Sequence, residues 1–251
     1  EATSNATIQI PQIQQNLLER VAEINENIAV VLFSGRPLDL RDVQVKAKAI
    51  LEVWMPGTEG AGAITDVLYG RYNPTGKLPM SFPYCVGQVP VHYNEYATGR
   101  PHVEGKDKDR FRSKYLDIPN APLYPFGYGL SYTTFTVSEV SLDKDSMKDG
   151  ESIRAAVTVK NTGTCAGTET IQLYLHDVAA SVVRPVKELK DFRKVTLEAE
   201  EVASVEFTIT EPELCFVSDN IIFESEAGSF EIFIGTDSTT TNKAKFTLEK
   251  Q

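Results

Sequence analysis

The hydrophobic pattern of this chain changes its period near Tyr132, and this change is the strongest constraint on the fold. Before Tyr132, apolar residues recur every three or four positions or form continuous runs. After Tyr132 they alternate with polar residues, as in strands with one buried face. The charge balance changes at the same place, because residues 1–130 carry 14 acidic and 13 basic side chains and residues 131–251 carry 21 and 12. Two domains of different structural class are therefore expected.

The pattern before Tyr132 predicts part of a parallel α/β sheet. Residues 11–26 are expected to form a helix with one apolar face, made by Ile13, Leu17, Val21 and Ile24. Two apolar runs rich in β-branched residues, 28–34 and 49–54, are expected to be strands buried on both faces. Residues 60–68 again show helical spacing. This order of strand, polar crossover, strand and helix is typical of parallel sheets.

The pattern after Tyr132 predicts an all-β, immunoglobulin-like sandwich. Four segments alternate clearly between apolar and polar residues, around Ile153, Ile171, Val205 and Ile232. Turn sequences separate them, such as Lys148-Asp-Gly150 and Glu226-Ala-Gly228. About seven short strands with such turns are typical of fibronectin-type sandwiches.

Between these parts, residues 71–130 are rich in glycine and proline and contain few periodic segments. A connection of this length is unusual in a compact domain unless it has a function or wraps another body. We therefore expect an α/β part at residues 1–83, a connecting segment at 84–132 and the sandwich at 133–251.

Composition excludes several classes of function. With a net charge of −10 and a pI of about 4.9, the chain would be repelled by phosphate backbones and anionic lipid surfaces. It contains no apolar run long enough for a membrane helix. The three cysteines (Cys85, Cys165 and Cys215) and the three histidines (His92, His102 and His176) do not have the spacing of metal ligands, so no metal or other cofactor is expected. The cysteines are expected to be small buried residues.

Two further features concern the amino-terminal half. The glycine-rich segment at residues 56–62 lies between a predicted strand and a predicted helix, so it could bind an anion or simply form a tight turn. Its glycine spacing matches neither nucleotide-binding motif, and the tight turn is favoured. The sequence starts at Glu1 with no Met and no apolar leader, which is expected of a processed or excised piece.

Several longer runs closely resemble glycoside hydrolase family 3, in particular its bacterial periplasmic β-glucosidase type. They occur in the family's order and cover most of the chain: residues 30–38, 49–60, 63–70, 73–83 and 124–135, with Asn161-Thr-Gly163, Arg184-Pro-Val-Lys-Glu-Leu189 and Phe233-Ile-Gly235 in the sandwich. The resemblance implies the end of a three-layer α/β sandwich followed by a fibronectin-III-like domain.

The resemblance also implies an activity, that of a retaining, exo-acting β-glucosidase that removes terminal glucose or a related sugar. Its nucleophile, an Asp, would lie in an amino-terminal barrel that this chain lacks. The general acid/base would be a Glu on a variable loop just before Ile10-Pro11-Gln12, and Glu1 is the residue in that neighbourhood. A β-glucoside or oligosaccharide substrate, the missing barrel as partner and a periplasmic or secreted location follow from the same resemblance.

An alternative from a different class is a stand-alone carbohydrate-binding or protein-interaction module, since sandwich domains often have such roles. Against it, the sandwich shows no row of aromatic residues for stacking on sugars. The single tryptophan, Trp54, lies in a predicted buried strand.

Overall fold

The computed structural model describes residues 5–103, 105–106 and 109–250. Its internal contacts divide the chain into two compact units. The first unit contains the described residues up to Tyr72, together with Met80–His92 and Tyr115–Pro125. The second contains Asn73–Pro79, the described part of 93–114 and the chain from Phe126 onward.

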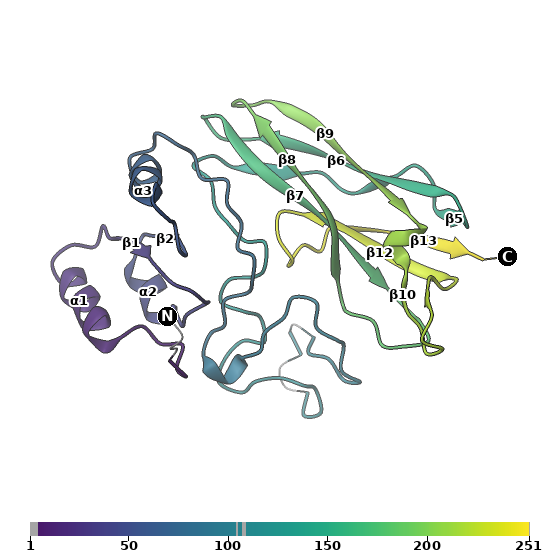
Figure 1. Cartoon of the computed structure of the whole chain (residues 1–251), viewed down its shortest axis with the longest axis horizontal. Helices are drawn as coiled ribbons and strands as arrows, with labels where there is room; N and C mark the ends of the chain where they lie inside the picture. The colour runs from purple at the N-terminus through teal and green to yellow at the C-terminus, as the bar shows by residue number, and fades with distance from the viewer. Residues whose placement is uncertain (1–4, 104, 107–108, 251) are drawn as a thin grey trace. The chain divides into compact units, whose positions relative to one another are not determined.

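The first unit is an α/β fragment built on two parallel strands (Figure 1). Its elements follow the predicted order and are α1 (Gln12–Ala22), β1 (Ala29–Leu32), α2 (Arg41–Lys46), β2 (Ala49–Glu52) and α3 (Gly60–Leu68). The two strands pair in register from Ala29 opposite Ala49 to Leu32 opposite Glu52. The fold class predicted for this half is confirmed. Helix α1 ends four residues before the predicted end, where the polar sequence Glu23-Ile-Asn-Glu-Asn27 begins.

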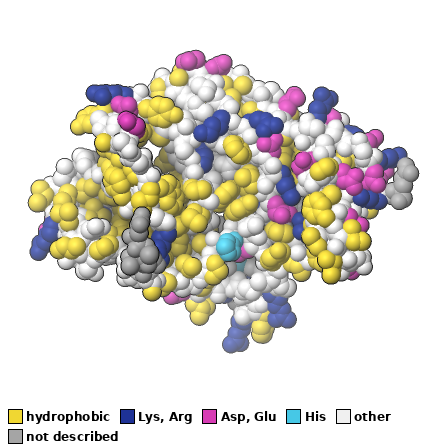
Figure 2. Space-filling model, viewed as in Figure 1, with side chains coloured by type: hydrophobic (Ala, Val, Ile, Leu, Met, Phe, Trp, Pro, Cys, Tyr) yellow, Lys and Arg dark blue, Asp and Glu magenta, His cyan; other side chains and the backbone are white. Residues whose placement is uncertain are grey.

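The prediction that both strands are buried on both faces is wrong for this chain. Leu32 is the one buried residue within β1, and β2 has none. The apolar stripe of α1 is open as well, with Ile13 75% and Ile24 88% exposed. Figure 2 shows hydrophobic side chains open to solvent on the surface of this unit. The reason is that the sheet has two strands in the described part of the chain, too few to cover a helix face or a strand face.

The second unit is a β-sandwich, as predicted. One sheet has five strands in the order β5-β13-β12-β7-β8, and in the other β6 pairs with β3 and β4 on one side and with β9 on the other (Figure 1). Strands β10 and β11 form a separate hairpin. The bounds are β3 (Phe135–Val137), β4 (Ser141–Leu142), β5 (Ser146–Lys148), β6 (Ser152–Asn161), β7 (Gly167–Asp177), β8 (Glu188–Leu197), β9 (Val202–Thr210), α4 (Glu211–Leu214), β10 (Phe216–Val217), β11 (Phe223–Glu224), β12 (Gly228–Gly235) and β13 (Lys243–Glu249).

The sandwich core is formed by the inward-facing residues of both sheets. In β6 every second side chain is buried, and the alternation predicted around Ile153 holds to Asn161. The rings of Phe230 and Phe246 stack with centroids 5.4 Å apart between neighbouring strands. The same cluster includes buried residues of β6, β7, β9 and β12, among them Ile153, Ile171, Phe207 and Ile232. The core is thus continuous across the two sheets and packs them against each other.

The long connection contains one short 3₁₀ helix, η1 (Val86–Gln88), and its ends are tied into the two units separately. In the second unit, the Leu78 N–H donates to the Tyr128 carbonyl and the Gly127 N–H donates to the Leu78 carbonyl. Lys77 Nζ lies 2.7 Å from the Gly129 carbonyl and 2.6 Å from the Glu169 carboxylate on β7. These contacts hold residues 77 and 78, within the sequence motif at 73–83, beside residues 127–129, within the motif at 124–135.

The prediction that the three cysteines are buried is wrong. All three cysteines are free thiols, but Cys165 is exposed, and Cys85 and Cys215 are only partly buried. Cys165 lies in the turn between β6 and β7, where its Sγ atom approaches the Tyr132 carbonyl at 3.5 Å. Cys165 is exposed because it lies in this turn, outside the alternating pattern that directs every second residue of β6 into the core.

Candidate functional site

The one catalytic residue nominated from the sequence, Glu1, lies outside the described residues. Its role as an acid/base therefore stays a prediction. The candidate site of the first unit is the edge at the carboxyl ends of its parallel strands, where α/β sheets ordinarily carry their ligands. Strands β1 and β2 both end at this edge, because they run parallel and in register.

Two turns leave this edge, and their polar groups meet. After β1 the chain continues as Phe33-Ser34-Gly35-Arg36, and after β2 as Val53-Trp54-Met55. The Ser34 side chain, 6% exposed, places Oγ 3.1 and 3.2 Å from the two oxygens of the Glu52 carboxyl group. The same Oγ lies 3.0 Å from the Arg36 carbonyl. The last residue of β2 is thereby tied to the turn that follows β1.

The Glu52 carboxyl group also shapes the turn after its own strand. The Trp54 N–H donates to Glu52 Oε1 at 2.8 Å. Burial raises the pKa of Glu52, while the hydrogen bonds from the Trp54 N–H and from Ser34 act in the opposite direction. No charged side chain contributes to this shift. The pKa of Glu52 is therefore the balance between burial, which raises it, and hydrogen bonds from two neutral donors, which lower it.

Trp54 is not part of a buried strand, which corrects the prediction from the sequence. It lies two residues beyond β2, is partly buried and has a φ angle of +50°, a left-handed conformation that costs energy for a residue with a side chain. Its ring packs at 5.8 Å from the buried ring of Phe82, which in turn meets Tyr124 edge-on at 6.2 Å. The hydrogen bond to Glu52 and this aromatic row together hold the unusual backbone.

The glycine-rich segment after Trp54 forms the tight turn that leads into α3. Gly57 has a φ angle of +72°, and a Cβ atom added at Gly60 would lie 2.6 Å from the Pro56 side chain. Glycine at both positions is thus explained by the turn itself. The structure offers no second observation in favour of an anion here.

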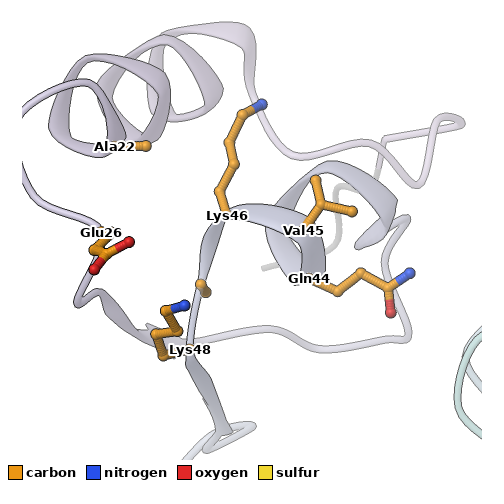
Figure 3. Close-up of a pocket in the computed structure, with 7 residues that line it drawn as sticks. Ala22, Glu26, Gln44, Val45, Lys46 and Lys48 are labelled. Atoms are coloured by element: carbon orange, nitrogen blue, oxygen red, sulfur yellow. The ribbon is translucent and has the colours of Figure 1, made fainter.

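A surface cavity of about 540 Å³ lies at the opposite, amino-terminal side of β2 (Figure 3). Its lining comes from the end of α1, from α2 and from the approach to β2, with Ala22, Glu26, Gln44, Val45, Lys46, Ala47 and Lys48. Lys46 extends toward α1, where its Nζ atom is 3.3 Å from Glu19 (Figure 3). This cavity is shallow, and it lies away from the strand ends where ligands are expected.

The buried charges of the sandwich have structural roles. Lys187 Nζ donates to the carbonyls of Ser238 and Thr240 and lies 4.4 Å over the Phe233 ring. Burial lowers the pKa of Lys187 to about 8. These contacts fasten the segment between β12 and β13, so Lys187 is a support of the fold rather than a catalytic base.

Neither a metal centre nor a membrane helix is found in the described part of the chain. No group of three or more His, Cys, Asp or Glu side chains there could hold a metal ion. No helix there is long and apolar enough to cross a membrane. Sequence reasoning missed Ser34 and Glu52, because their meeting depends on the register of β1 against β2, which no local pattern reveals.

Two segments of the chain match known protein families. Residues 1–132 match the family described as the glycosyl hydrolase family 3 C-terminal domain. Residues 169–238 match the family described as a fibronectin type III-like domain. The two matches fall on either side of the change in hydrophobic period.

Known relatives resemble the chain along almost its whole length. A periplasmic beta-glucosidase of Salmonella typhimurium is 48% identical over 99% of this chain and 32% of its own length. Thermostable beta-glucosidase B of Acetivibrio thermocellus is 40% identical over 95% of this chain and 32% of its own length. The crystal structure of a beta-glucosidase from Listeria innocua matches with a TM-score of 0.94 at 42% identity, over 99% of this chain and 34% of that one. The chain thus spans about a third of the length of these relatives.

Proposed function

We propose that this chain, which belongs to glycosyl hydrolase family 3, is the carboxyl-terminal part of a β-glucosidase. The observation that supports this most strongly is the pairing of both matches in one chain with relatives named as β-glucosidases. The substrate class would be β-glucosides, with terminal glucose or a related sugar released. A periplasmic or secreted location is proposed from the name of the Salmonella relative.

In this proposal the chemistry is divided between two parts of a longer protein. Retaining hydrolysis needs a nucleophilic carboxylate and an acid/base carboxyl group about 5–5.5 Å apart. The nucleophilic Asp would come from an amino-terminal barrel, and Glu1 is the acid/base candidate of this chain. The proposed domain boundaries, 1–83, 84–132 and 133–251, belong to the same account.

The open surfaces of the first unit support a larger α/β domain. The two-stranded parallel sheet is too small to bury the apolar residues of this unit. Ile13 and Leu17 on α1, and Ile24 just after it, remain exposed. Additional strands beside β1 and β2, with helices over them, would cover these residues. The relatives contain about three times the length of this chain, which leaves room for such strands and for the barrel.

The proposal predicts that the chain by itself neither hydrolyses nor binds sugars. Incubated alone with an aryl β-glucoside, it should release no aglycone above a buffer blank, because one of the two carboxyl groups is missing. Calorimetric titration with glucan oligosaccharides should show no heat of binding. Turnover that persists through further purification would contradict the divided site, whereas binding without turnover would favour the interaction module.

A further inference from the structure

The Ser34 hydroxyl group is surrounded by more hydrogen-bond acceptors than it can donate to. It has one hydrogen, yet Oγ lies within 3.0–3.2 Å of three oxygens, the Arg36 carbonyl and both oxygens of the Glu52 carboxyl group. Ser34 is 6% exposed, and Glu52 and Arg36 are partly buried, so water has limited access to this cluster. A buried oxygen that is left without a donor costs free energy. The protonation state of Glu52 therefore decides which of these contacts are hydrogen bonds.

With Glu52 ionised, the carboxylate can only accept. The Ser34 hydroxyl must then choose between Glu52 and the Arg36 carbonyl, and one of the two contacts is lost. With Glu52 protonated, its O–H can donate to Ser34 Oγ, and Ser34 is free to donate to Arg36. The other Glu52 oxygen, Oε1, still accepts the Trp54 N–H at 2.8 Å. The protonated form thus makes three hydrogen bonds in one chain, from the Trp54 N–H to Glu52, from Glu52 to Ser34 and from Ser34 to the Arg36 carbonyl.

We propose that Glu52 is a proton-bearing positioning residue, which ties the turn after β1 to the turn after β2 through the chain Trp54–Glu52–Ser34–Arg36. The tie fixes the Arg36 backbone on one side. On the other it holds Trp54 in its left-handed conformation. Both turns lie at the carboxyl edge of the sheet, so their relative position sets the shape of the surface that an α/β sheet offers to ligands. The inference concerns the folded first unit and does not depend on the proposed function.

The direction of the pKa shift agrees with this geometry. Burial raises the pKa of Glu52, so the folded state binds its proton more tightly than the unfolded state. This contribution to stability is present below the unfolded pKa of about 4.5 and is lost as the pH rises through the higher folded value. Among the described residues, the groups that act on the pKa of Glu52 besides its burial are the Trp54 N–H and the Ser34 hydroxyl, both of which are neutral.

The test follows the Glu52 carboxyl carbon by ¹³C NMR in the 251-residue chain, with Glu52→Gln used to assign the signal. We expect the Glu52 midpoint to lie above 4.5, the ordinary value of a glutamate carboxyl group. The titration is read from the unchanged chain, so no variant has to stay folded across the pH range. A Glu52 midpoint at the ordinary value would overturn the proposal.

Stability against pH gives a second, independent readout. The amide of Glu52→Gln can donate to Ser34 and accept from Trp54, as the protonated acid does, so this variant should match the unchanged chain at low pH and exceed it as the pH rises. Glu52→Leu, which can do neither, should be less stable at every pH. The matched control, Glu26→Gln at an exposed position of the same unit, should lower stability less than Glu52→Leu does. Equal losses in Glu52→Gln and Glu52→Leu at low pH would show that no proton-mediated tie exists.

Discussion

Replacing Lys77 by Met is expected to destabilise the second unit by about 3–5 kcal/mol, the cost of leaving one partner of a buried ion pair alone. Lys77 Nζ lies 2.6 Å from Glu169, and the two side chains are 13% and 9% exposed. The remaining carboxylate on β7 would keep the hydrogen bond from the Thr170 N–H but lose its only counter-charge within salt-bridge distance among the described residues. The measurement is the free energy of unfolding from urea denaturation of the chain.

A matched control separates burial from charge. Lys144 pairs with Glu151 at 2.7 Å, but their side chains are 34% and 48% exposed, so Lys144→Met should cost much less than Lys77→Met. The double variant Lys77→Met with Glu169→Leu should recover much of the loss, because it removes the unpaired charge. A cost for Lys77→Met no larger than that of Lys144→Met would contradict the assigned role of the pair.

Replacing Asn161 by Ala is expected to cost about 2–6 kcal/mol, because two backbone carbonyls lose donors, at about 1–3 kcal/mol for each buried group left unsatisfied. Asn161 is fully buried at the end of β6. Its amide donates to the carbonyls of Cys165 and Leu197 at 2.8 and 3.1 Å. Its oxygen accepts from the Thr133 hydroxyl at 2.6 Å and from the Gly163 N–H at 3.1 Å.

The control for Asn161 is an exposed asparagine. Asn220 makes its hydrogen bond to the adjacent Asp219, so Asn220→Ala should change the unfolding free energy by no more than about 0.5 kcal/mol. Thermal or urea unfolding of the two variants under the same conditions makes the comparison. Indistinguishable stabilities would mean that the Asn161 network contributes little.

The sandwich could be predicted from the sequence because its signal is local. In strand β6 every second residue is buried over the full length of the strand. The alternation of apolar residues that begins at Ile153 therefore predicts both the strand and the face that is buried. Asn161 also stood out as part of a motif. Its role could not be read, however, because its partners Thr133 and Leu197 lie 28 and 36 residues away.

The first unit was harder to predict for a physical reason. The apolar runs at 28–34 and 49–54 predict strands buried on both faces, and the elements do form, but the two strands have no further neighbours in the described residues. The burial of a strand depends on the elements that pack against it. The strands were therefore predicted correctly, but their burial was not. Trp54 shows the same effect, since a turn rather than a strand sets its conformation.

We propose that this chain supplies one part of a β-glucosidase site and that a preceding barrel supplies the other. The most direct test is to express the chain joined to the amino-terminal portion of a close relative, such as the Salmonella periplasmic beta-glucosidase, and to assay an aryl β-glucoside. We predict turnover with retention of anomeric configuration in the joined protein and none in either part alone. A joined protein that folds but does not turn over, or a chain that turns over alone, would contradict the claim.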